Sequence, residues 1–170
     1  MLSDICIYIY TRLVDIDKYV IHLLCCLFSA YYMYVYLAEV EQRHISDNVL
    51  FVVNSSHSQL SHWMGISLIG LHSMWNEHFG ISIVEMLAAG LIVIAHNSGG
   101  PKFDIINTNE GKRNGFLAET AEEYAECMRD VLDHYDRYKH VRQAAKDSSK
   151  LFSDEIFKEQ MVQEFKFIIE

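Results

Sequence analysis

Two carboxylates stand alone in a long apolar stretch of this chain. Between residues 48 and 101, Glu77 and Glu85 are the only side chains with a formal charge. An ionised carboxylate in apolar surroundings costs free energy unless it is exposed to water or paired. Two hypotheses follow: both acids bind a polar ligand, or Glu77 caps a helix and Glu85 faces solvent.

A predicted helix begins just after Glu77 and contains Glu85. Its start offers a second group of ligand-binding atoms. Apolar residues from Phe79 to Ala89 recur at helical spacing, and Gly90 is a typical helix end. The backbone N–H groups of Gly80, Ile81 and Ser82 lie at its start. Free N–H groups and the helix dipole together attract a phosphate or another anion.

Three histidines near this segment, His72, His78 and His96, raise the question of a metal. No HExxH motif is present, and their spacings match no usual set of zinc ligands. We interpret them as loop or core histidines, and we expect neither a metal nor another cofactor.

Four cysteines occur in the chain, Cys6, Cys25, Cys26 and Cys127, and none forms a CxxC pair. This usage is typical of a reducing compartment and excludes a disulfide-rich scaffold.

The elements that position these residues alternate between strands and helices. Short apolar runs predict strands, and helical periodicity with capping residues predicts helices. The predicted strands are Val49–Val53, Ile66–Leu71, Leu91–Ala95 and Gly115–Ala118, and a loop is expected from His96 to Pro101. The first two predicted helices are His57–Met64 and Phe79–Ala89. A third helix follows the Thr120–Glu123 capping box, and its apolar face consists of Tyr124, Met128, Val131 and Tyr135. A fourth helix follows Ser153, and its apolar stripe consists of Phe157, Met161, Phe165 and Ile168. This order predicts a doubly wound, Rossmann-like α/β domain with a parallel sheet, which binds ligands beyond the carboxyl ends of its strands.

Composition limits the class of protein. The chain has 170 residues, 51% of them hydrophobic, and one proline, which fits one folded domain and excludes a disordered chain. Its formal net charge is −9 and it has no basic run, so we expect no nucleic-acid binding.

The first 38 residues differ from the rest, and we divide the chain into residues 1–38 and a domain at 39–170. From Val20 to Ala38 no side chain is charged, a length that approaches a membrane span. The run also contains several tyrosines, which prefer the membrane interface. A membrane anchor, a buried helix and a stretch that is not native coding sequence are the three interpretations.

Several motifs follow one another in an order that resembles a known family. They are Glu77–Glu85 (E-x7-E), Ala88–Gly90, Ser98–Pro101 and Asn114–Ala118. Together they are similar to the C-terminal, donor-binding half of the retaining GT-B glycosyltransferases of family 4. The runs Gly70–Gly80 and Ala95–Lys102 are similar to the members that use GDP-mannose and dolichol-linked oligosaccharides. The similarity spans residues 37–167.

The resemblance implies a function. It is α-1,2-mannosyl transfer from GDP-mannose to a dolichol-diphosphate-linked Man3-4GlcNAc2 oligosaccharide, at the cytosolic face of the endoplasmic reticulum membrane. Glu85 would bind the ribose hydroxyls of GDP, and Glu77 would be the catalytic residue that contacts the transferred mannose. No metal would take part.

The resemblance also implies the other donor contacts. Backbone amides of Phe79, Gly80, Ile81 and Ser82 would hold sugar and diphosphate. The loop of Ser98, Gly99 and Gly100 would line the nucleotide crevice, and Lys102 would reach a phosphate.

The chain departs from the family pattern because it matches only one of the two GT-B domains. Transfer requires donor and acceptor to be held together, so we expect this chain to be inactive by itself. The alternatives are a nucleotide-sugar-binding protein without catalysis and a related glycosyltransferase with a different donor, such as a UDP-sugar.

Overall fold

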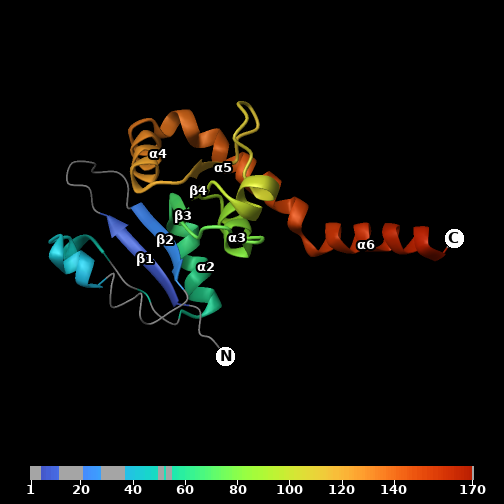
Figure 1. Cartoon of the computed structure of the whole chain (residues 1–170), viewed down its shortest axis with the longest axis horizontal. Helices are drawn as coiled ribbons and strands as arrows, with labels where there is room; N and C mark the ends of the chain where they lie inside the picture. Colours follow the sequence, from blue (N-terminus) through green and yellow to red (C-terminus); the bar gives the residue numbers. More distant parts are fainter. Residues whose placement is uncertain (1–4, 12–20, 28–36, 50–51, 53–54, 170) are drawn as a thin grey trace.

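A five-stranded sheet forms the centre of the molecule. The computed structural model describes residues 5–11, 21–27, 37–49, 52 and 55–169 (Figure 1). The strands are β1 (Ile5–Thr11), β2 (Ile21–Leu27), β3 (Ile69–His72), β4 (Ile92–His96) and β5 (Gly115–Ala118), in the spatial order β1-β2-β3-β4-β5. Strands β2 to β5 are parallel and β1 is antiparallel to β2. The predicted α/β class is confirmed.

Helices cover the sheet on both faces. The long ones are α2 (His57–Ile66), α3 (Ile81–Ala89), α4 (Ala121–Asp133), α5 (Tyr135–Ser149) and α6 (Asp154–Ile169). Short helical turns are η1 (Ser46–Asn48), η2 (Pro101–Ile105, a π-helix) and η3 (Lys150–Phe152). Residues 37–42 are also helical.

Strand β4 is buried on both faces because its side chains alternate between two apolar clusters. Val93 and Ala95 pack in the cluster that includes α3, whereas Ile92 and Ile94 pack in the cluster that includes α4. Helix α5 contributes to both clusters. Burial on both faces explains the uninterrupted apolar run in the sequence.

Most predicted elements are present, with shifted ends. Helices α2, α3 and α4 match the predictions, and Thr120 and Glu123 form the predicted capping box. Strand β5 has the predicted bounds, whereas β3 begins later than predicted because α2 continues through Ile66. The strand predicted at Val49–Val53 falls largely on residues outside those described.

Two local predictions are wrong. The segment from His96 to Pro101 is not a loop throughout, since residues from 99 are helical and continue into η2. Tyr135 does not lie on α4, because that helix ends at Asp133 and Tyr135 begins α5. At the break, His134 leaves helical geometry (φ −125°, ψ 37°) and its Nδ1 lies 2.9 Å from Asp130 Oδ1.

The first part of the chain extends the sheet. Strand β2 is paired with β1 on one side and β3 on the other, so residues 21–27 are not the buried helix considered above. Within the part of the chain that the structure describes, no helix has the length and apolar character needed to cross a bilayer. Residues 28–36 lie outside the residues that the structure describes. The domain boundary at residue 38 stays a prediction.

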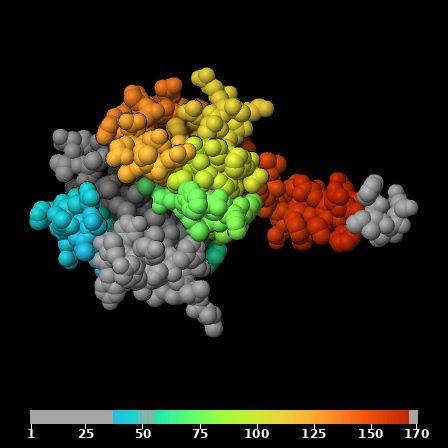
Figure 2. Space-filling model, viewed as in Figure 1, coloured from blue at the N-terminus to red at the C-terminus, as the bar shows by residue number. Residues whose placement is uncertain are grey.

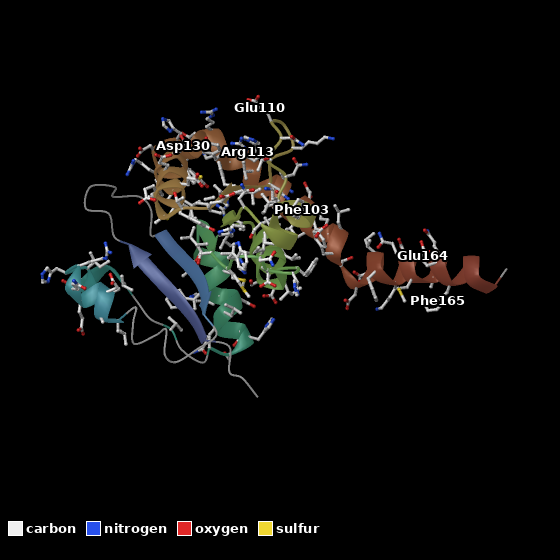
Figure 3. All side chains as sticks on the ribbon, in the orientation of Figure 1. Phe103, Glu110, Arg113, Asp130, Glu164 and Phe165 are labelled. Atoms are coloured by element: carbon white, nitrogen blue, oxygen red, sulfur yellow. The ribbon has the colours of Figure 1, made fainter. Side chains whose placement is uncertain are left out.

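Helix α6 extends away from the rest of the molecule (Figures 1 and 2). Its predicted apolar stripe is exposed: the exposed fractions are 63% for Phe157, 39% for Met161 and 53% for Phe165. Figure 3 labels Glu164 and Phe165 on this projecting part.

Two glycines let the loop after β4 touch the loop after β3. A Cβ atom on Gly99 would lie 2.2 Å from the carbonyl oxygen of Glu77, and one on Gly100 would lie 2.3 Å from that of His78. The Gly100 N–H donates to the Glu77 carbonyl oxygen at 2.8 Å. The two loops are thereby joined by their backbones.

Asn114, at the start of β5, connects three further segments. Its side-chain amide donates to the Ile105 carbonyl oxygen (2.9 Å) and to Ser148 Oγ (2.8 Å), and its Oδ1 accepts from the Asn107 N–H (2.8 Å). The side chain is 2% exposed. It therefore satisfies buried polar groups of η2, of the following loop and of α5.

Substitution of Gly100 by Ala should destabilise the fold. The added methyl group meets backbone atoms, which cannot move cheaply, and we expect a loss of about 2 kcal/mol or more in the free energy of unfolding. Urea denaturation measures it. The matched control is Gly65→Ala in α2, where an added Cβ meets nothing within 4 Å. Equal stability of Gly100→Ala and wild type would contradict the loop contact.

Substitution of Asn114 by Ala should cost about 1–3 kcal/mol, because buried hydrogen-bonding groups lose their partner. Asn109→Ala, at an exposed position of the same loop, is the control and should change stability by less than about 0.5 kcal/mol. Chemical denaturation of both variants compares them. If the two losses are equal, the Asn114 network does not stabilise this region.

Candidate functional site

Glu77 lies in the loop between β3 and α3, at the carboxyl end of the sheet. Asn76 before it has φ 55°, in the left-handed region that asparagine tolerates better than most residues. The Asn76 N–H donates to Ser98 Oγ at 2.8 Å, which fixes this turn to the neighbouring loop. The Glu77 side chain is 22% exposed and thus reaches the surface.

The first turn of α3 has no side-chain cap. Gly80 precedes the helix with φ 97°, and no side chain caps the helix there. A Cβ atom on Gly80 would lie 3.5 Å from Glu77 Cγ, so Glu77 packs beside this turn. The first N–H groups of a helix lack intrahelical partners, and Ile81 beside them is 63% exposed. The sequence predicts an anion at this helix start, and that contact stays a prediction.

Glu85 lies on the exposed face of the same helix. Ile81 and Glu85 are both exposed, one helical turn apart, whereas the opposite side of α3 is buried in the core through Ile83, Val84, Met86 and Leu87. A helix rises 1.5 Å per residue, so Glu85 stands roughly 6 Å along the axis from Ile81. The helix therefore presents Glu85 on the same exposed face as Ile81 in its first turn.

The segment after β4 lies beside Glu77, and its polar groups contact protein. Ser98 Oγ accepts from Asn76 and also forms a 2.8 Å hydrogen bond with His96 Nδ1. Gly99 and Gly100 approach the backbone of the loop after β3, which is the close approach that the structure assigns to them. Their contact with a nucleotide stays a prediction.

Phe79 and Lys102 are the two remaining residues that the sequence analysis assigns to donor binding. The Phe79 ring packs edge-to-face on Phe152 of η3, with ring centroids 5.5 Å apart, which leaves its backbone as the predicted donor. Lys102, on η2, is exposed, and its ammonium lies 5.7 Å from the centroid of the Phe103 ring.

His72 is a member of this site that sequence reasoning missed. It ends β3, is 5% exposed, and its Nε2 lies 3.9 Å from Glu77 Oε2. Burial lowers the pKa of His72, although the nearby Glu77 charge opposes this. The sequence contains no signal for the contact, because it depends on how the loop after β3 returns over the strand.

Together these residues place the Glu77 carboxylate beside the uncapped first turn of α3. Across the described residues, no group of three or more His, Cys, Asp or Glu side chains is placed to hold a metal ion. Glu77, Ser98, Gly99 and Gly100 are brought together by contacts, and Ile81, Ser82 and Glu85 share α3. Their individual roles toward a donor stay predictions.

The sequence is similar to curated mannosyltransferases. A mouse protein named GDP-Man:Man(3)GlcNAc(2)-PP-Dol alpha-1,2-mannosyltransferase is 45% identical over 118 residues, which cover 69% of this chain and 24% of the mouse protein. A Dictyostelium discoideum protein of the same name is 39% identical over 129 residues, covering 76% of this chain and 25% of that protein. The chain spans about a quarter of the length of these relatives.

The fold and the sequence place the chain in one family. Sucrose-phosphate synthase from Thermosynechococcus elongatus, a GT-B enzyme, superimposes with a TM-score of 0.71 at 22% identity, over 82% of this chain and 35% of that one. The family described as "Glycosyl transferases group 1" matches residues 33–148. The chain therefore belongs to the group 1 glycosyltransferases, and its fold corresponds to the Rossmann-like C-terminal half of a GT-B enzyme.

Proposed function

We propose that this chain is the donor-binding part of a retaining glycosyltransferase that moves mannose from GDP-mannose to a dolichol-linked oligosaccharide. The observation that carries the proposal is the uncapped first turn of α3, with Glu77 beside it and Glu85 on the exposed face of the helix. The names of the similar proteins support the same donor, acceptor and α-1,2 linkage.

Donor binding follows from the chemistry of α3. The diphosphate lies at the helix start, where the backbone N–H groups of Gly80, Ile81 and Ser82 and the helix dipole offset its charge. Lys102 adds a cation from η2. Glu85 accepts hydrogen bonds from the ribose hydroxyls.

Transfer depends on charge that develops as GDP leaves. The bond between mannose C1 and the phosphate oxygen breaks, and its electron pair stays with GDP. Fixed N–H donors stabilise that charge without a metal ion. C1 bonds to the acceptor hydroxyl oxygen, whose proton passes to the departing diphosphate of GDP, and Glu77 holds the mannose through its hydroxyls.

The acceptor would be presented at the cytosolic face of the endoplasmic reticulum membrane. The relatives named above are about four times longer than the matched region. We therefore assign donor binding to this chain and expect no mannosyl transfer from it in isolation. A role in donor binding without transfer is the second candidate.

GDP-mannose should raise the melting temperature of the chain in thermal-shift measurements. At a ligand concentration 100 times Kd, the stabilisation is about 2.7 kcal/mol. Glu85→Ala should abolish the shift, whereas Glu110→Ala, an exposed acid in the loop before β5 (Figure 3), should keep it. No shift with the wild-type chain would overturn the proposed function.

GDP should compete with GDP-mannose more strongly than UDP does. The guanine and uracil bases offer different hydrogen-bonding edges, so a site built for GDP loses contacts with UDP. Displacement of GDP-mannose by each nucleotide, followed by calorimetry, gives the two affinities. Tighter binding of UDP would favour the related transferase with a UDP-sugar donor.

A further inference from the structure

The side chain of His72 is buried where few polar partners reach it. The Tyr124 hydroxyl donates to its carbonyl oxygen at 3.0 Å, which fixes the backbone at the end of β3. Its ring nitrogen Nδ1 is buried without a hydrogen-bond partner. A buried polar atom of this kind is uncommon and calls for a reason beyond packing.

The surroundings of the ring select one tautomer. A proton on Nδ1 would turn the Nε2 lone pair toward the Glu77 carboxylate, whose Oε2 lies 3.9 Å away. A proton on Nε2 points an N–H at that carboxylate, an interaction that the other tautomer cannot make. The Nε2 tautomer is therefore favoured.

Charged and titratable groups face the ring from two sides. Glu77 approaches from the loop after β3, and His96 lies at the end of the adjacent strand β4, where its charge would oppose protonation of His72. Burial has the largest effect on the pKa of His72 and lowers it, so the imidazole is neutral near pH 7. His72 thus acts as a neutral N–H donor.

We propose that His72 is a positioning residue whose Nε2–H orients the Glu77 carboxylate toward the sugar of the donor. This role rests on the proposed function. The 3.9 Å separation of Nε2 and Glu77 Oε2 exceeds a hydrogen bond, and a small rotation of the Glu77 side chain closes it. One carboxylate oxygen is then held by His72, and the other accepts sugar hydroxyls.

Two substitutions separate this role from packing. His72→Leu keeps an apolar side chain of similar size but removes the donor, whereas His72→Gln restores an amide N–H near the position of Nε2. His140→Leu, at an exposed position of α5, is the control. Calorimetry compares the affinities for GDP-mannose and for GDP, because only the former carries the sugar.

We expect His72→Leu to lower the affinity for GDP-mannose about tenfold, as loss of one hydrogen bond to a charged group does. The affinity for GDP should stay within about twofold, and His72→Gln should recover most of the loss. Equal affinities of wild type and His72→Leu for GDP-mannose would overturn the positioning role and leave the proposed function intact. A wild-type chain that binds neither nucleotide overturns both.

A titration without nucleotide tests the contact itself. In NMR measurements, Glu77→Gln should lower the pKa of His72 further, because the carboxylate that raises it is removed. An unchanged pKa of His72 would overturn the proposed pairing. This measurement needs no substitution of His72, so it holds even if His72→Leu fails to fold.

Discussion

A direct contact between two backbones organises the whole candidate site. Gly99 and Gly100 press against the carbonyl oxygens of Glu77 and His78 at distances that no side chain permits. The Gly100 N–H and Ser98 Oγ then hydrogen-bond to the facing loop. The backbone of Glu77 is thereby held at the edge of the sheet, beside the start of α3.

The contact depends in turn on the sheet below it. Strands β3 and β4 are parallel neighbours, with His72 opposite Ala95 in the register, so their carboxyl ends bring the two loops to the same edge. Apolar clusters on both faces of β4 hold that register. At the far end of α3, Arg142 Nε donates to the Gly90 carbonyl oxygen at 2.7 Å, a favourable place for a cation because of the helix dipole.

Sequence patterns predicted the elements with strong periodicity and missed those set by tertiary contacts. The apolar run of β4, the glycine end of α3 and the capping box of α4 act over a few residues, and each was predicted correctly. The break between α4 and α5 contains neither glycine nor proline, so the sequence has no local signal that predicts it. The strand at Ile21–Leu27 shares its apolar composition with a buried helix, and only pairing with β1 and β3 distinguishes them.

The candidate site was predictable to a similar extent. Glu77, Glu85 and the start of α3 stood out because charges and glycines are placed unusually in the sequence. Ser98 was named through the family resemblance, and His72 was interpreted only as a loop or core histidine. Their contacts were not predicted, since they join segments that are distant along the chain or depend on how a loop folds. On α6, helical periodicity correctly predicts an apolar stripe, but periodicity does not say whether other residues cover that stripe, and here it is exposed.

Helix α3 has a length that its two ends fix independently. Gly80 and Gly90 both adopt left-handed backbone angles, φ 97° and 81°, and neither end can slide without placing a Cβ-bearing residue in that region. The fixed start of the helix therefore sets the position of Glu85 relative to the first turn, beside which Glu77 lies. One residue inserted or deleted before Glu85 would turn that carboxylate by about 100° around the axis, away from the exposed face that it shares with Ile81. An exchange of side chains at constant length leaves this spacing unchanged.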